Sequence, residues 1–124
     1  MTVERQASDL LARTKAFALA TIHFYARMPP HIVAQVLGRQ LLRSATSVGA
    51  QYREAQRAKS ISDFLSKTEG ALQELDEAGY WLELINDSGT DTSSAVKGLQ
   101  GEATEFLAIF VSITRKAKEK KLRG

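Results

Sequence analysis

Apolar residues recur at intervals of three and four along most of this chain, and this spacing constrains its fold more than any other feature. An α-helix has 3.6 residues per turn, so such spacing gathers apolar side chains on one face of a helix. The only two prolines are adjacent, at Pro29 and Pro30, and no later position is barred from a helix by a proline ring. The sequence therefore predicts an all-α fold.

The same spacing divides the chain into four expected helices, separated by residues that are typical of turns and helix caps. We expect helices at residues 5–28, 32–59, 63–87 and 92–119, with a basic C-terminal tail at residues 115–124. Short connections favour antiparallel neighbours. The expected architecture is a single domain folded as an antiparallel up-down-up-down four-helix bundle.

Each expected helix has one apolar stripe, which we assign to a shared core. Gly38 and Gly49 lie inside the second helix, where glycine is less favourable than alanine by about 1 kcal/mol. We therefore expect another helix to approach closely at these two positions. The residues assigned to the core are Leu10, Thr14, Phe17, Thr21, Phe24 and Met28 in the first helix, Val33, Leu37, Leu41, Ala45, Val48, Tyr52 and Ala55 in the second, Phe64, Thr68, Ala71, Leu72, Leu75, Ala78, Gly79, Leu82 and Ile85 in the third, and Val96, Leu99, Ala103, Phe106, Phe110, Ile113 and Ala117 in the fourth.

The composition argues against several classes of protein. The 124 residues contain no cysteine, which excludes disulfide bonds and thiolate metal sites. The longest apolar run is too short to span a bilayer. The polar N-terminal segment MTVERQASDL lacks the apolar region of a signal peptide. We therefore expect a cytoplasmic protein that does not bind membranes.

Charge is distributed unevenly along the chain, although the formal net charge is only +3. Residues 32–59 contain five basic and one acidic residue, whereas residues 63–87 contain one basic and seven acidic residues. The last ten residues, RKAKEKKLRG, contain six basic residues and one acidic residue. This tail is either a solvated terminus or part of a nucleic-acid-binding surface. Its candidate binding residues are Arg115, Lys116, Lys118, Lys120 and Lys121.

Four arginines lie on the face of the second expected helix that is opposite its core stripe, over about 27 Å of helix. They are Arg39, Arg43, Arg53 and Arg57. A row of cations of this kind suits the phosphate backbone of RNA or DNA. Alternatively, the arginines pair with Glu74, Glu77 or Glu83 of the acidic third helix, within or between subunits. The sequence leaves both interpretations open.

Tyr80, Trp81 and Leu84 point away from the core stripe of the third expected helix. Large apolar side chains grouped on an exposed face usually mark an interaction surface. We therefore predict that these three residues form a homo-oligomer interface. The alternative is that a loop of the same chain covers them.

No pattern indicates catalysis or a bound cofactor. Carboxylate-bridged metal sites in helical bundles use a glutamate three residues before a histidine, and neither His23 nor His31 has one. The chain also lacks the Gly-x-Ser-x-Gly nucleophile motif and the Gly-x-x-x-x-Gly-Lys phosphate loop. We predict that the protein is not an enzyme and uses no metal or cofactor.

The segment RSATSVGAQYREAQRAKS, followed by SDF, LSK and ELDEAGYWLELI, resembles a bacterial family of four-helix-bundle proteins. These are related to the proteins encoded by intervening sequences in 23S ribosomal RNA genes. The resemblance implies an antiparallel bundle and homo-oligomers, commonly ring-shaped pentamers, and implies no known activity. This chain has Gln51 and Tyr52 where the family pattern usually has Asn and Ile.

A more distant resemblance is to the accessory protein of diversity-generating retroelements, a basic pentamer that binds nucleic acid and a reverse transcriptase. It implies RNA or DNA, and a reverse transcriptase, as partners. Our first hypothesis is therefore a non-enzymatic homo-oligomer, a pentamer by resemblance, that binds nucleic acid through the arginine row and the basic tail. The alternative is a protein-interaction scaffold, or a reverse-transcriptase accessory protein, with no intrinsic nucleic-acid specificity.

Overall fold

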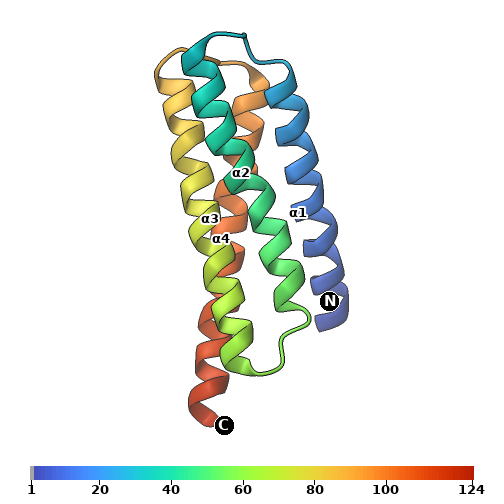
Figure 1. Ribbon diagram of the computed structural model, residues 1–124. Coiled ribbons are helices and arrows are strands. Elements are labelled where there is room, and N and C mark those ends of the chain that lie inside the picture. The colour runs from blue at the N-terminus through green and yellow to red at the C-terminus, as the bar shows by residue number, and fades with distance from the viewer. Residues whose placement is uncertain (1) are drawn as a thin grey trace.

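The computed structural model describes residues 2–124, with all their side chains except those at positions 3 and 4. These residues form four helices and no β-strand: α1 (Val3–Ala26), α2 (Ile32–Ala55), α3 (Ile61–Asp87) and α4 (Ser94–Arg123). Figure 1 shows the helices side by side, each running opposite to the helix before it. The predicted all-α four-helix bundle is confirmed.

The connection between α2 and α3 is longer than expected, because α2 ends at Ala55 and not near Lys59. Ser60 has an extended backbone and caps α3, since its Oγ accepts a hydrogen bond from the Asp63 amide at 3.0 Å. The Asp63 carboxylate accepts a hydrogen bond from the Lys59 amide at 3.2 Å. These two bonds resemble a capping box, which satisfies amides at a helix start. As a result, α3 begins at Ile61, two residues earlier than expected.

The basic C-terminal segment is helical, which corrects the expectation of a tail beyond residue 119. α4 continues to Arg123. Lysine, arginine, glutamate, alanine and leucine, which make up residues 115–123, are strong helix formers. The last turn contains Lys120, Lys121 and Arg123, and cations are favourable at a helix C-terminus. The cations of this segment therefore project from a regular helix.

Aromatic side chains from three helices meet at the centre of the bundle. The Phe17 ring packs edge-on against Phe106, with ring centroids 5.7 Å apart. Tyr52 packs in the same way against Phe110, at 5.3 Å. Both pairs were assigned to the core from their spacing, and all four residues are buried.

Two details of the expected core are wrong. Val33 is 50% exposed, and Ala34 is buried in its place. Position 34 lies seven residues before the buried Leu41 and almost on the same line of the helix, whereas position 33 is turned about 80° to one side. In α3, Leu65 is buried and Phe64 is only half-buried.

Close contacts at two glycines set the register between α1 and α2. A Cβ atom at Gly38 would clash with the Tyr25 ring and would lie 2.9 Å from the Sδ of Met28. A Cβ atom at Gly49 would lie 3.3 Å from the Oγ1 of Thr14. The predicted close approach of another helix is confirmed at both positions, and that helix is α1.

Each helix packs against two others, and the α1–α4 pair makes less contact than the α1–α2, α2–α3 and α3–α4 pairs. Arg13 bridges the two helices, with Nη2 2.9 Å from Oε1 of Glu102 and Nη1 3.2 Å from Oε1 of Glu105. Its guanidinium carbon also lies 4.8 Å from the centroid of the Phe106 ring. Arg13 therefore links α1 to α4, and the opposite side of α1 packs against α2.

Candidate nucleic-acid interface

The contacts between helices define a common level along the bundle axis. Thr14 of α1 lies against Gly49 of α2, and Gln51 of α2 packs over Gly70 of α3. Gly70 in turn borders the same groove as Val111 of α4. Because the helices alternate in direction, residues before this level in α1 and α3 lie at the same end of the bundle as residues after it in α2 and α4.

Lysine and arginine are concentrated at one end. Residues 2–15, 50–70 and 108–124 contain 13 of the 17 Lys and Arg residues and 6 of the 14 Asp and Glu residues. Their formal charge is therefore +7, and that of the rest of the chain is −4. Figure 1 shows both chain termini and the α2–α3 connection at this end, which we call the basic end. The electrostatic field of such a concentration of positive charge attracts polyanions before they contact the protein.

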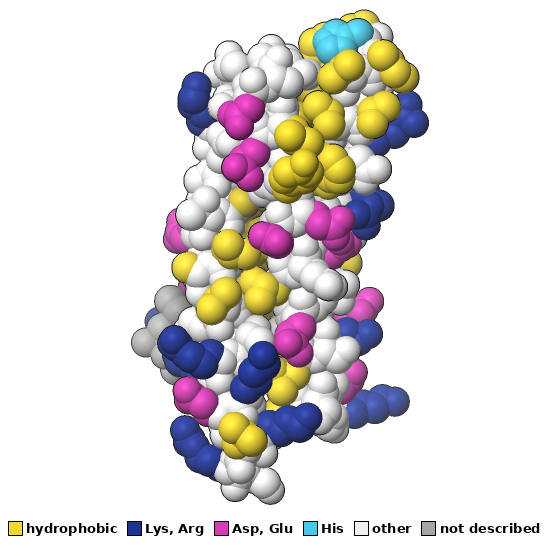
Figure 2. Space-filling model, turned by 90° about the vertical axis from the view of Figure 1, so that its left-hand side faces the viewer, with side chains coloured by type: hydrophobic (Ala, Val, Ile, Leu, Met, Phe, Trp, Pro, Cys, Tyr) yellow, Lys and Arg dark blue, Asp and Glu magenta, His cyan; other side chains and the backbone are white. Residues whose placement is uncertain are grey.

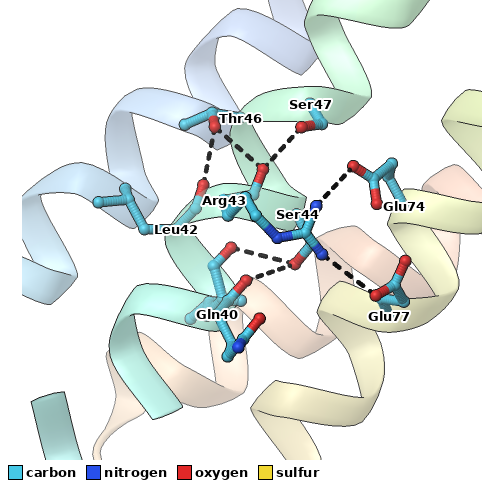
Figure 3. A network of polar contacts seen from close by, with 9 residues as sticks. Gln40, Leu42, Arg43, Ser44, Thr46, Ser47, Glu74 and Glu77 are labelled. Atoms are coloured by element: carbon cyan, nitrogen blue, oxygen red, sulfur yellow. Dashed lines mark hydrogen bonds and ion pairs between the residues drawn. The ribbon is translucent and has the colours of Figure 1, made fainter. Parts of the chain in front are cut away.

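Arg43 belongs to the other part of the bundle and is engaged within the chain. Its Nη1 lies 3.3 Å from Oε2 of Glu74, and its Nη2 lies 3.2 Å from Oε1 of Glu77. Figure 3 shows the guanidinium reaching from α2 to both carboxylates on α3. For this one arginine, the structure supports pairing with the acidic third helix.

The other three arginines of the row are exposed, and none forms an ion pair with a described side chain. Arg53 and Arg57 lie at the basic end, whereas Arg39 lies nearer the start of α2. The carboxylate of Glu54, which lies between Arg53 and Arg57 in the sequence, is 3.2 Å from the Nζ of Lys67 instead. The expected row is therefore divided into one arginine that is paired with carboxylates and three that form no ion pair with a described side chain.

Arg53 and Arg57 also border a groove of about 610 Å³ between α1 and α2. Lys15 on α1 borders the same groove from the other helix. We call this the α1–α2 groove; no carboxylate is among the described residues that line it. Sequence reasoning missed Lys15, because its only local signal is a position beside the core residue Thr14, and its approach to Arg53 depends on the register of the two helices.

The candidate residues of α4 are spread around the helix, and only one of them pairs with a described carboxylate. Lys118 Nζ lies 3.5 Å from Oε2 of Glu69 on α3. Four of the predicted tail residues are exposed and form no ion pair with a described side chain: Arg115, Lys116, Lys120 and Lys121. These cations extend the positive charge of the basic end beyond the α1–α2 groove.

The three residues predicted to form an oligomer interface are not equally exposed. Tyr80 is 54% exposed, and Leu84 is half-buried. Trp81 packs against the core, and its Nε1 is buried without a hydrogen-bond partner among the described residues. Packing within the same bundle therefore covers much of Trp81, so only part of the predicted surface faces outward.

Sequence reasoning missed further exposed apolar residues at the start of α2. Ile32, Val33 and Val36 are 69%, 50% and 49% exposed, respectively. Because α2 runs opposite to α3, its start lies at the same end as Tyr80. Figure 2 shows hydrophobic side chains gathered toward the upper end of the face on which α3 lies. We call Ile32, Val33, Val36, Tyr80 and Leu84 the apolar patch.

Two observations concern side chains that often take part in metal binding or catalysis. The described residues contain no group of three or more His, Cys, Asp or Glu residues that could hold a metal ion. Buried hydroxyls donate hydrogen bonds to carbonyl oxygens of their own helices: Thr14 to Leu10 at 2.7 Å, and Thr114 to Phe110 at 2.8 Å. These hydroxyls are therefore structural. Among the described helices, none combines the length and apolar character needed to cross a membrane.

Comparison with known proteins supports the resemblance found in the sequence. A family model described as 23S rRNA-intervening sequence protein matches residues 7–112. The chain belongs to this family. No curated protein matches the chain.

Among solved structures with the same fold is one that is also similar to this chain in sequence. It is a protein with unknown function from the S23 ribosomal protein family of Bacteroides thetaiotaomicron. The two are 32% identical, with a TM-score of 0.77, over 84% of this chain and 96% of that chain. Neither description names an enzymatic activity. Residues 113–124, which hold six cations of the basic end, lie outside the matched family segment.

Proposed function

We propose that this family member is a non-enzymatic homo-oligomer that binds RNA or DNA through its basic end. The separation of charge carries the proposal: 13 of the 17 cations lie at one end of the bundle, while 8 of the 14 carboxylates lie elsewhere. Scattered cations that are each paired with a carboxylate would provide no such surface.

The local geometry agrees with this role. Lys15, Arg53 and Arg57 border one groove, whose described lining residues include no carboxylate, and the cations of residues 115–123 lie at the same end. Phosphate binding needs cations spaced along a surface and no catalytic geometry. Cations near the end of α2 and a second group on α4 can contact successive phosphates of a flexible polyanion.

The oligomeric part of the proposal is supported by the apolar patch. A monomer that exposes Ile32, Val36 and Tyr80 to this extent leaves apolar surface in water, and a second copy of the chain would remove it. The resemblance suggests a pentamer. Sedimentation at micromolar concentration tests this, and a single species of 13.6 kDa would refute the oligomer.

Titration of a labelled oligonucleotide at two salt concentrations tests nucleic-acid binding. If about six phosphates are contacted, affinity should fall by about 10³ between 50 and 200 mM salt. Arg53→Ala combined with Arg57→Ala should weaken binding and flatten this salt dependence. Arg27→Ala combined with Lys97→Ala removes the same charge from the opposite end and is the matched control. Absence of binding at low salt, or equal losses in the two double variants, would refute the role of the basic end.

The alternative function is a protein-interaction scaffold, or a reverse-transcriptase accessory protein, with no intrinsic nucleic-acid specificity. The observation that favours it is the apolar patch together with Arg43, which is held by Glu74 and Glu77. The alternative predicts assembly without oligonucleotide binding at 50 mM salt. Charge reversal at Arg43 would then weaken stability or assembly only.

A further inference from the structure

We infer that the α1–α2 groove is a binding site for a single strand of RNA or DNA, in preference to a duplex. Lys15, Arg53 and Arg57 bind its phosphates, and a base lies against the apolar floor of the groove. The inference rests on the proposed function and adds to it the site and the form of the ligand.

The charge of the groove selects an anion. Its two walls contribute three cations and no carboxylate among the described residues. Four other grooves on the bundle differ, because each is bordered by at least one carboxylate, such as Asp76 or Glu69 along α3 and Glu102 between α1 and α4. An anion entering the α1–α2 groove therefore meets attraction from both sides and no lining charge of its own sign.

The spacing of the cations suits an extended chain of phosphates. Arg53 lies in the last turn of α2, Arg57 lies two residues beyond the end of this helix, and both border the groove. The contact between Thr14 and Gly49 brings α1 close and places Lys15 on the opposite wall. A strand that runs along the groove can thus be held from both helices.

The apolar side chains that line the groove, which we call its floor, are mostly small. The floor includes Leu11, Ala12, Ala18 and Ala50, and the absence of a side chain at Gly49 lets the two helices approach beneath it. The volume of about 610 Å³ is within the range of about 300–1,000 Å³ found for small-molecule pockets. A nucleotide can enter such a space with its base against alanine methyl groups.

These features favour a single strand over a duplex. Single strands can turn a base outward and stack it on an arginine guanidinium plane, and cationic grooves that follow a backbone are typical of proteins that bind single strands. The bases of a duplex are stacked inside, so a duplex could meet only the rim cations. The apolar floor would then contribute nothing to binding.

Two polar side chains can add contacts. Gln56 borders the groove and forms no side-chain hydrogen bond with the described residues, so its amide can donate and accept. The Thr46 hydroxyl already donates to the Leu42 carbonyl at 2.8 Å and can only accept. A base edge or a sugar hydroxyl could be bound by Gln56.

Fluorescence anisotropy with the full chain tests the inference. The probes are a labelled oligouridylate, an oligothymidylate and a DNA duplex of the same length, at low salt. We expect the single strands to bind more tightly than the duplex by about tenfold or more. Ala50→Leu fills the groove without changing its charge, and should weaken single-strand binding by about tenfold while leaving duplex binding unchanged. Ala108→Leu makes the same change at an exposed position of α4 and is the matched control.

A second pair of variants tests the charge of the groove. Lys15→Ala should weaken single-strand binding several-fold, whereas Lys97→Ala at the opposite end should not. Circular dichroism checks that each variant is folded. If single strand and duplex bind with equal affinity and Ala50→Leu changes neither affinity, the groove is refuted as the site. The proposed function would still stand if binding is salt-sensitive and requires Arg53 and Arg57. If no oligonucleotide binds, the proposed function and this inference both fail.

Discussion

Replacing Gly38 with alanine tests whether α1 and α2 approach as closely as the structure indicates. A Cβ atom there would clash with the Tyr25 ring and lie 2.9 Å from the Sδ of Met28. At Gly101, in α4, a Cβ atom would meet nothing within 4 Å. Gly38→Ala and Gly101→Ala therefore make the same chemical change, one against a neighbouring helix and one in open space.

The expected magnitudes follow from two opposing effects. Alanine in place of glycine inside a helix stabilises it by about 1 kcal/mol, and Gly101→Ala should raise the free energy of unfolding by this amount. At Gly38 the same gain is opposed by overpacking, which costs about 1–3 kcal/mol. Gly38→Ala should therefore leave the free energy of unfolding unchanged or lower it by up to about 2 kcal/mol.

Urea unfolding followed by circular dichroism measures both values against the wild type. Each variant is compared at the same protein concentration, because oligomerisation would make apparent stability depend on concentration. Equal stabilisation by Gly38→Ala and Gly101→Ala would show that α1 does not contact α2 at Gly38. The register that brings Lys15 toward Arg53 would then be refuted as well.

Three further predictions concern a paired arginine, a buried tyrosine and the apolar patch. Arg43→Ala should lower the free energy of unfolding by about 0–1 kcal/mol, because its ion pairs are exposed, and should leave oligonucleotide affinity nearly unchanged; a large loss of affinity would show that Arg43 contacts the ligand. Burial raises the pKa of Tyr52 above its ordinary value of 10.0, so its stabilising contribution is present below pH 10 and is lost as the pH rises through the higher folded pKa. Tyr52→Phe should remove this loss in urea unfolding above about pH 10, and parallel curves for the two proteins would exclude Tyr52 as the cause. Val36→Ser combined with Tyr80→Ser should shift sedimentation toward the monomer, whereas an unchanged sedimentation coefficient would exclude the apolar patch as an interface.

The local structure was largely predictable because it depends on spacing within one helix. The repeat that includes Leu10, Phe17 and Phe24 identified the buried face of α1. The errors arose at helix ends, where few residues remain to define the phase of the stripe. Val33 is such a case, since the choice between positions 33 and 34 depends on how the first turn of α2 meets its neighbours.

The candidate site was only partly predictable. The sequence placed Arg53 and Arg57 on an exposed face, and both are exposed. It could not separate them from Arg43, which occupies a similar angle but lies opposite Glu74 and Glu77. The difference between a paired and an unpaired arginine is therefore a matter of position along the bundle axis.

The sequence by itself determined the four helices, their core faces and the amount of charge that each helix carries. Tertiary structure alone decided which helix surfaces lie opposite each other: Lys15 joins Arg53 at one groove, and Arg53 lies at the same end of the bundle as the cations of residues 115–123. Periodicity defines the angle of a residue around its own helix but says nothing about how far one helix is shifted along another. That shift is set by packing, here by the contact of Thr14 with Gly49 and of Tyr25 with Gly38.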